Sequence, residues 1–198
     1  MKFLILFFLT ITTIFANSSK EILLLHSYNN GLKWTDGITQ GIKEILDKYP
    51  EFELTIEYMD SKKIDSQEYF DILMNLYEKK FSNRKYSVVI AADNYAYEFV
   101  LKNHKKLFDE SSVVFTGVEN FDKDFIPLEL KKYVTGVVEY KEIKENIELI
   151  KKTITDLNTL YIISDDTFSS LAIKEQILND VKSFEKNIKI VFDNKIDI

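Results

Sequence analysis

Cysteine is absent from this 198-residue sequence, which also has only two prolines, five glycines and two histidines. The lack of cysteine excludes disulfides, thiolate metal sites, a thiol nucleophile and a lipid-modified N-terminal cysteine. The scarcity of proline and glycine leaves no flexible linker visible between independent domains. Because cysteine and histidine are the main ligands of transition metals, we expect neither a bound metal nor another cofactor.

Basic patches and catalytic motifs are missing as well. The formal net charge is −6, and lysine is mixed with glutamate instead of forming the basic stripe of a nucleic-acid-binding protein. We therefore exclude nucleic acid as a partner. There is no serine nucleophile elbow, no HExxH, no P-loop and no GxGxxG. We predict that the chain is not an enzyme and has no catalytic residues.

The first sixteen residues differ from the rest of the chain. Lys2 precedes an apolar run over residues 3–15, and Ala16 is small enough for a cleavage site. The run is shorter than the roughly 20 residues that span a bilayer as a helix. We predict a signal peptide over residues 1–16, with an uncleaved membrane anchor as the alternative. Either outcome places the remaining chain in the periplasm or another extracytoplasmic space.

The rest of the sequence is globular in composition and switches repeatedly between strand-like and helix-like hydrophobic patterns. Continuous aliphatic runs predict strands that are covered on both faces. "FELTIEYMD" (52–60) alternates instead, which predicts a strand at the sheet edge. Helical spacing over Ile38, Ile42, Ile45 and Tyr49 predicts a helix with a buried apolar face, capped by Thr35 or Asp36. The buried strands are "EILLLHS" (21–27), "YSVVIAAD" (86–93), "SSVVFTGVEN" (111–120), "YVTGVVE" (133–139), "TLYIISDD" (159–166) and "IKIVFDN" (188–194).

This alternation predicts an α/β fold with a mostly parallel, doubly wound sheet. The alternating strand comes second in the chain, so we expect it at the edge, with the first strand inside. Such a sheet opens a crevice at the carboxyl ends of its strands. Polar or small residues gather at these ends, where each could bind a ligand or simply form a turn or helix cap.

Four stretches of the sequence are distinctive: "LLLHSYNNGLKWTDGITQGI", "VVIAADNYAYEFV", "VVFTGVENFD" and "VTGVVE". They resemble the type I periplasmic-binding-protein fold, and more narrowly the ABC transporter substrate-binding family. Members of that family also serve as sensor domains of histidine kinases and diguanylate cyclases. The resemblance covers nearly all of residues 20–194. It implies an N-terminal α/β lobe over residues 20–139 and the start of a second α/β lobe, truncated, over residues 140–198.

Two groups of candidate ligand-binding residues follow the first strand. Trp34 could stack on a flat ligand at the mouth of the cleft, or pack on the first turn of the helix that follows it. Ser27, Tyr28 and Asn29 could bind a carboxylate or phosphate together with free N–H groups, or form an ordinary turn. His26 ends a buried strand, and we expect it to be a neutral, hydrogen-bonded core histidine.

The other candidates follow the later strands. Asp93 and Asn94 are ligand-binding candidates after the third strand, where the acidic side chain could receive the amino group of a ligand; the alternative is that these residues only cap the next helix. A glycine after the fourth strand would let the backbone approach a ligand closely. The remaining candidates are Gly117, Glu119, Asn120 and Glu139, followed by Asp165, Thr167 and Phe168, which would face the ligand from the second lobe.

Together these features predict an extracytoplasmic sensor domain that binds a small molecule between two lobes and signals by lobe closure. The ligand would be an amino acid or another small polar metabolite. Its partner would be a membrane signalling module, or an ABC permease if the chain is instead a free solute-binding protein of an importer; a homodimer is a further candidate assembly. Two competing hypotheses are an exported α/β hydrolase that uses Asp93 or Glu119, and a structural domain with an empty cleft.

Overall fold

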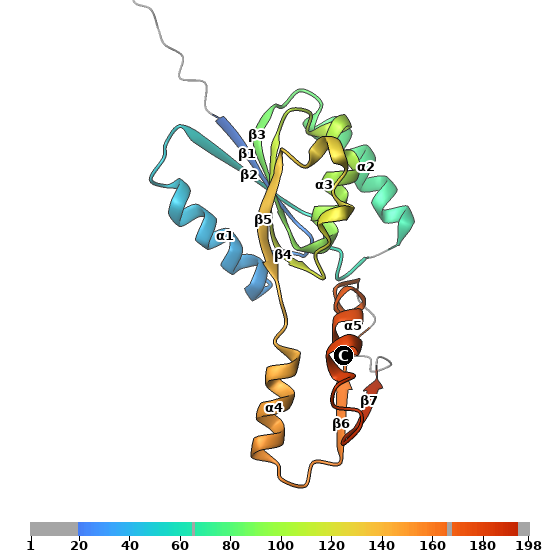
Figure 1. Ribbon diagram of the computed structural model, residues 1–198. Helices are drawn as coiled ribbons and strands as arrows, with labels where there is room; N and C mark the ends of the chain where they lie inside the picture. Colours follow the sequence, from blue (N-terminus) through green and yellow to red (C-terminus); the bar gives the residue numbers. More distant parts are fainter. Residues whose placement is uncertain (1–19, 65, 166–167, 194–198) are drawn as a thin grey trace, which may run out of the picture.

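The computed structural model of the chain describes residues 20–64, 66–165 and 168–193. The predicted signal peptide lies outside these residues. The described part begins with a five-stranded sheet and its helices, and continues into a smaller α/β part (Figure 1). The strands of the sheet are β1 (Lys20–His26), β2 (Phe52–Tyr58), β3 (Tyr86–Ala92), β4 (Ser112–Glu119) and β5 (Val134–Glu139). Its helices are α1 (Lys33–Leu46), α2 (Gln67–Phe81) and α3 (Asp93–Leu107), with short 3-10 turns η1 (Lys123–Phe125) and η2 (Leu128–Leu130).

The five strands are all parallel and lie in the order β2-β1-β3-β4-β5. This confirms the expectation that the second strand forms an edge and the first lies inside. Leu23, Leu24 and Leu25 of β1 are completely buried, whereas most of β2 is half-buried. The carboxyl ends of the parallel strands consequently meet at one edge of the sheet.

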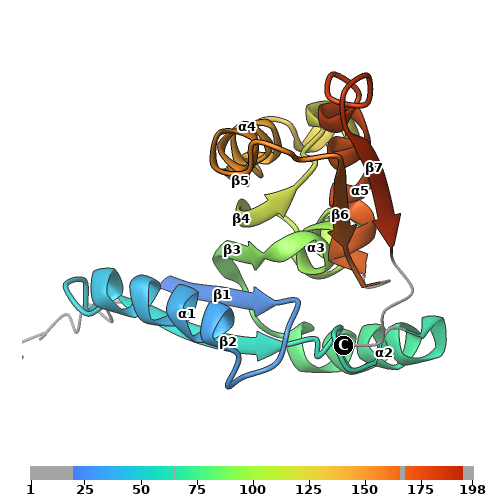
Figure 2. The ribbon, with the colours of Figure 1, turned by 90° about the horizontal axis from the view of Figure 1, so that it is seen from below.

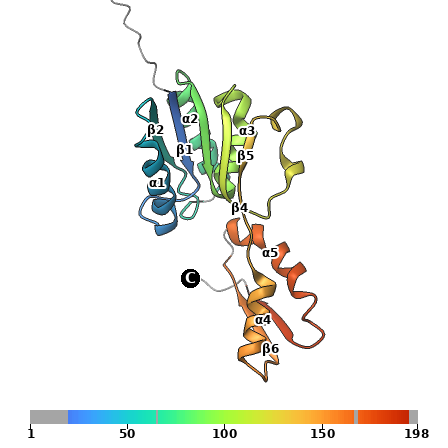
Figure 3. The same cartoon turned by 60° about the vertical axis from the view of Figure 1, so that its left-hand side comes forward.

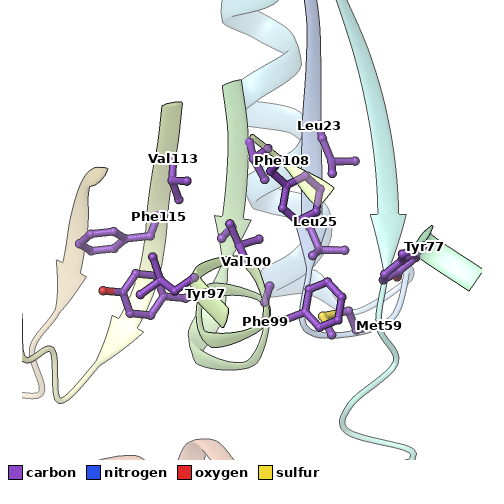
Figure 4. Close-up of a cluster of buried hydrophobic side chains, with 14 of the residues drawn as sticks. Leu23, Leu25, Met59, Tyr77, Tyr97, Phe99, Val100, Phe108, Val113 and Phe115 are labelled. Atoms are coloured by element: carbon purple, nitrogen blue, oxygen red, sulfur yellow. The ribbon is translucent and has the colours of Figure 1, made fainter. Parts of the chain in front are cut away.

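Helices α2 and α3 cover one face of the sheet, and α1 lies on the opposite side (Figures 1 and 2). The main hydrophobic core lies under α2 and α3 (Figure 4). It is rich in aromatic rings, and Tyr77 stacks on Phe81 at 5.1 Å between centroids while its edge meets Phe99. Phe99 belongs to α3, whose first turn carries the candidate ligand-binding residues Asp93 and Asn94.

Helix α1 differs from its prediction in two respects. It begins at Lys33, so Thr35 and Asp36 lie inside the helix and cap nothing; the N-cap position is Leu32, without a side-chain hydrogen bond. The Asp36 carboxylate instead accepts a hydrogen bond from the Gly31 N–H. The predicted apolar face is also less buried than expected, since Ile45 is 55% exposed.

His26 is buried at the end of β1, as expected. Its Nε2 lies 2.8 Å from Thr39 Oγ1, and its ring stacks on Tyr58. Burial lowers the pKa of His26 to about 4, partly offset by Asp36. The histidine is therefore neutral over the physiological range.

The smaller part contains α4 (Ile143–Thr153), β6 (Thr159–Ile163), α5 (Phe168–Val181) and β7 (Lys189–Asp193). Strands β6 and β7 pair in parallel, and a second small core forms around Ile147, Ile177, Val181 and Phe184. This part lies below the carboxyl ends of the large sheet, and the chain enters it from β5 (Figures 1 and 3). Among the described helices, none combines the length and the apolar character needed to cross a membrane.

Candidate functional site

A hollow of about 430 Å³ opens where the carboxyl ends of the large sheet face the smaller part of the chain. We call it the acidic hollow, because carboxylates are its most frequent lining groups. Residues from both parts of the chain form its wall. They are Tyr28, Trp34, Lys62, Asp93, Glu119, Glu139, Lys141, Asp165, Ser170 and Ile173.

Asp93 and Trp34 form the base of the acidic hollow. Asp93 is the first residue of α3, has the left-handed backbone angle φ 70° and is 5% exposed. The Trp34 indole N–H donates a hydrogen bond of 2.9 Å to its Oδ1. Trp34 is the second residue of α1 and not, as expected, a residue preceding the helix. It is 45% exposed, so its ring remains accessible to a ligand.

Gly117 provides the space in which these two side chains meet. Its φ is +69°, and a Cβ at this position would lie 3.0 Å from Asp93 Oδ1 and 3.2 Å from Trp34 Cζ2. Both the backbone angle and the close approach favour glycine. Gly117 therefore contributes to the site through the space that its missing side chain leaves, which the side chains of Trp34 and Asp93 occupy.

Asp93 has unusual electrostatics for a carboxyl group. Burial raises the pKa of Asp93 to about 7, against the opposing effect of the Trp34 hydrogen bond, and the nearby Glu139 and Glu119 raise it further. Its Oδ2 is buried without a hydrogen-bond partner among the described residues. A buried acceptor in this state is costly unless it is protonated or a ligand supplies a donor. Asp93 is thus suited to receive the ammonium group of a ligand.

Lys141 holds two further carboxylates at the ends of adjacent strands. Glu119 and Glu139 are paired in the register of β4 and β5, and Lys141 Nζ lies between them. It forms an ion pair of 2.9 Å with Glu119 Oε1 and another with Glu139 Oε1. Burial lowers the pKa of Lys141, but the hydrogen bonds to Glu139 and Glu119 raise it overall. Burial also raises the pKa of Glu119, whose Oε2 has no partner among the described residues.

The rest of the wall consists of an aromatic side chain with its neighbouring lysine, and of residues from the smaller part of the chain. Tyr28 is 8% exposed, and Lys62 Nζ lies 4.6 Å from the centroid of its ring. Asp165, Ser170 and Ile173 approach from the end of β6 and from α5. The lining therefore carries four carboxylates against two lysines, and this excess of acid favours a ligand with a positively charged group.

The predicted residues do not all meet in this hollow. Ser27 is completely buried behind it: its hydroxyl donates to Ala92 O and accepts from the Ala96 N–H, both at 2.8 Å. The side-chain amide of Asn29 donates a hydrogen bond to the backbone carbonyl of Asn30 within the turn. Both residues therefore shape the loop after β1 and do not line the hollow.

Asn94 and Asn120 line a neighbouring pocket. The Asn94 amide forms two hydrogen bonds with the backbone of Glu119, donating to its carbonyl and accepting from its N–H. Asn120 has a left-handed φ of 49° and is exposed. Thr167 lies outside the described residues, as does the side chain of Phe168.

The residue-based prediction missed four members of the wall, namely Lys62, Lys141, Ser170 and Ile173. Lys141 lies two residues after Glu139, the last residue of β5, so its positive charge could have indicated an ion pair at this strand end. Lys62 and Ser170 lie beyond the strand ends, so no pattern within the strands indicated them. No group of three or more His, Asp or Glu side chains within the described ranges could hold a metal ion.

Comparisons with known proteins place the fold. No family model matches the chain, and no curated protein matches it. Among solved structures, a conserved domain protein from Vibrio cholerae O1 biovar El Tor matches with a TM-score of 0.63 at 16% identity, covering 89% of this chain and 57% of the other. An ABC domain in complex with L-Trp from Streptococcus pneumonia matches with a TM-score of 0.62 at 16% identity, covering 86% and 55%. A leucine-binding protein, LivK, from Thermotoga maritima matches with a TM-score of 0.57 at 12% identity, covering 90% and 50%.

The chain thus has the fold of the type I periplasmic-binding proteins, and the predicted fold class is confirmed. The large sheet with its helices corresponds to one lobe of that fold, and α4 to β7 correspond to part of the second lobe. The chain spans only 50% to 57% of the length of these three solved structures.

Proposed function

We propose that this chain is an extracytoplasmic small-molecule-binding domain that takes its ligand in the acidic hollow between two lobes. In this proposal residues 20–139 form the first lobe and residues 140–198 begin the second. The observation that carries the proposal is Asp93, a carboxylate that is 5% exposed and has an unpartnered Oδ2 among the described residues, at the base of a hollow lined from both lobes. Such a group is retained in a folded protein at a cost, which a ligand's donor would offset.

The chemistry of the hollow indicates a ligand with an ammonium group and a flat or apolar part. Asp93 would accept hydrogen bonds from the ammonium group, and Glu139 and Asp165 would add to the negative potential around it. Tyr28 and the exposed face of Trp34 would contact the apolar part. Two of the solved structures with this fold are described as an L-Trp complex and a leucine-binding protein, which supports an amino acid or a related amine.

Signalling would follow from closure of the two lobes on the ligand. The lobes are joined at the end of β5, where Glu139 and Lys141 flank the connection, so a hinge there would move α5 relative to the strand ends. A ligand that contacts Asp93 from one side and Asp165 from the other would bind the closed form better. Only this difference in affinity can shift the equilibrium and transmit a signal.

A free solute-binding protein that serves an ABC permease is the second candidate, because its ligand site would have the same geometry. The sensor assignment requires a membrane signalling module as the partner. The gene sequence beyond Ile198 distinguishes the two: a membrane-spanning helix followed by a kinase or cyclase domain supports the sensor, and a stop codon after the second lobe supports the importer.

A thermal-shift and calorimetric screen of the full chain with the common amino acids and small amines tests ligand binding. We expect at least one compound with an ammonium group to raise the melting temperature, since a ligand that binds the native state stabilises it by mass action. Asp93→Asn should abolish the shift, while Asp109→Asn, an exposed substitution beyond the far end of α3, should preserve it. A screen in which only anions bind, or in which Asp93→Asn keeps full affinity, would contradict the proposal.

A further inference from the structure

A second pocket of about 380 Å³ adjoins the acidic hollow and differs from it in chemistry. It lies between the first turn of α3, the end of β4, the segment that follows β4, and Leu171 of α5. We call it the aromatic pocket, and its characteristic residues are Tyr97, Phe121, Phe125, Glu98 and Asp122. Of the residues that line the acidic hollow, the aromatic pocket shares only Glu119. The two cavities are therefore neighbours on opposite sides of one residue.

Three aromatic rings surround part of this pocket at mutually tilted angles. The centroid of Tyr97 lies 6.4 Å from that of Phe121, with 51° between the ring planes. It lies 6.4 Å from that of Phe125 as well, with 42° between the planes. Phe115 stacks on Phe121 from behind at 5.0 Å and holds it in place. Phe125 is 53% exposed, so a ligand in the pocket could reach its ring.

The charge on this wall is entirely negative among the described residues. Glu98, Glu119 and Asp122 line the pocket, and no lysine or arginine does so. Lys141 pairs with Glu119 from the acidic hollow, and Asp122 Oδ1 accepts a hydrogen bond from the Asp124 N–H. Burial raises the pKa of the Tyr97 hydroxyl, and the nearby Glu98 and Asp122 raise it further. Burial raises the pKa of Glu98, so its carboxylate gains from a cation nearby. The Tyr97 hydroxyl is buried and has no partner among the described residues.

We propose that the aromatic pocket is a second binding site, for a small organic cation of the quaternary ammonium class. A methylated ammonium group has no N–H to donate, so it is held by the faces of aromatic rings and by nearby carboxylates. This chemistry differs from that expected at Asp93, which offers a hydrogen-bond acceptor. Because Leu171 of α5 lines the pocket opposite Tyr97 on α3, a bound cation would also favour the arrangement in which α5 lies against α3.

Calorimetric titration of the full chain with choline tests this site, with 3,3-dimethylbutan-1-ol as the neutral isostere of the same shape. We expect choline to bind saturably and at least about tenfold more tightly than the neutral alcohol, which corresponds to about 1.4 kcal/mol. Equal affinities would show that the pocket selects only apolar shape and would overturn the proposal. Absence of saturable choline binding would overturn it as well.

Substitutions locate the bound cation. Phe125→Ala and Glu98→Gln should each weaken choline binding at least about fivefold, through loss of a ring face or of a carboxylate. Leu128→Ala is the matched control, since Leu128 is 81% exposed and does not line the pocket. Asp93→Asn should leave choline affinity unchanged. If Asp93→Asn abolishes choline binding and Phe125→Ala does not, choline occupies the acidic hollow; that result overturns this inference and leaves the proposed function intact.

Discussion

The indole N–H of Trp34 donates to the carboxylate of Asp93 at 2.9 Å, across a distance of 59 positions in the sequence. Trp34 belongs to α1 and Asp93 to α3, so this hydrogen bond joins helices on opposite sides of the sheet. Trp34 is also the only tryptophan in the chain. Its fluorescence therefore reports directly on the base of the acidic hollow.

Substitution of Gly117 by alanine should disrupt this contact. The added Cβ would lie 3.0 Å from Asp93 Oδ1, and alanine would also have to adopt a φ of +69°. We expect Gly117→Ala to lower the free energy of unfolding by about 1–3 kcal/mol in denaturant titrations. The emission of Trp34 should change as its ring is displaced.

Gly37→Ala is the control for this experiment. Gly37 lies in α1, and an added Cβ would meet no atom within 4 Å. Alanine in a helix is favoured over glycine by about 1 kcal/mol, so this variant should be as stable as the original or more stable. Equal destabilisation by both substitutions would show that the space at Gly117 does not matter.

Asp93 should make the protein less stable as the pH rises. Its pKa is about 7 in the folded protein and near 3.8 in an ordinary environment. Between these values the folded state retains a proton that the unfolded state has lost, so the free energy of unfolding falls from about pH 4 to about pH 7. Asp93→Asn should remove this contribution. The difference between the two proteins in denaturant titrations across this range isolates it from other titrating groups.

Trp34 fluorescence provides a second reading of the same titration. We expect an emission change with a midpoint near pH 7, the pKa of Asp93. The change should be absent in Asp93→Asn. A transition of equal size and midpoint in both proteins would assign it to another group.

Ser27 should matter for stability and not for ligand affinity. Its buried hydroxyl both donates to Ala92 O and accepts from the Ala96 N–H. Removing it in Ser27→Ala leaves two buried backbone groups without this partner and should cost about 1–3 kcal/mol of unfolding free energy. Ser82→Ala is the control, because within the described part of the chain this exposed hydroxyl bonds Lys79 O alone, and its loss should stay within about 0.5 kcal/mol. A loss of ligand affinity in Ser27→Ala protein that remains folded would place Ser27 in the site after all.

Lys141 should stabilise the ligand-free protein by separating two carboxylates. In Lys141→Met, Glu119 and Glu139 would face each other without a cation, and we expect a loss of about 1–3 kcal/mol at neutral pH. Adding Glu139→Gln to this variant should restore part of the stability, which a double-mutant cycle measures.

Lys131→Met is the matched control for Lys141→Met. Lys131 pairs with an exposed carboxylate, that of Asp124, at 3.4 Å, and such surface pairs contribute about 0–1 kcal/mol. If Lys141→Met is as stable as Lys131→Met, the two glutamates do not repel each other in the folded protein.

The order of the first strands in the sheet could be predicted from the sequence, but the burial of β5 could not. Residues 133–139 were predicted to be a buried strand, yet Val137 and Val138 are 69% and 49% exposed because β5 forms the other edge of the sheet. The unbroken aliphatic run of β1 predicted burial on both faces, and the alternation in β2 predicted an edge; the strand order bears out both. Helix boundaries were harder. For α1 the pattern favoured Thr35 or Asp36 as the cap, and the observed N-cap is Leu32, without a side-chain hydrogen bond. Neighbouring polar residues are equivalent candidates for a cap until the backbone geometry is known.

The site could be predicted only to the level of strand ends. Parallel strands bring Asp93, Glu119 and Glu139 to one edge, so these three could be placed together from pattern alone. The division into two cavities could not be predicted. Glu119 lines both cavities, and its backbone is held by two hydrogen bonds to the Asn94 amide, which lies 25 positions away in the sequence. Side-chain orientation of this kind is set by tertiary contacts and leaves no periodic signal.

The all-parallel strand order also determines how the chain can reach its native state. Ile22 pairs with Leu54 on one side and with Val88 on the other, and within the described residues no two neighbouring strands form a hairpin. Each pairing must therefore close a long loop before it gains any contact, and such non-local topologies fold on a timescale of about milliseconds to seconds. Until β3 pairs with β1, the backbone hydrogen-bonding groups along one side of this aliphatic strand are unpaired and can associate with another chain. Refolding at high protein concentration should consequently favour aggregation over recovery.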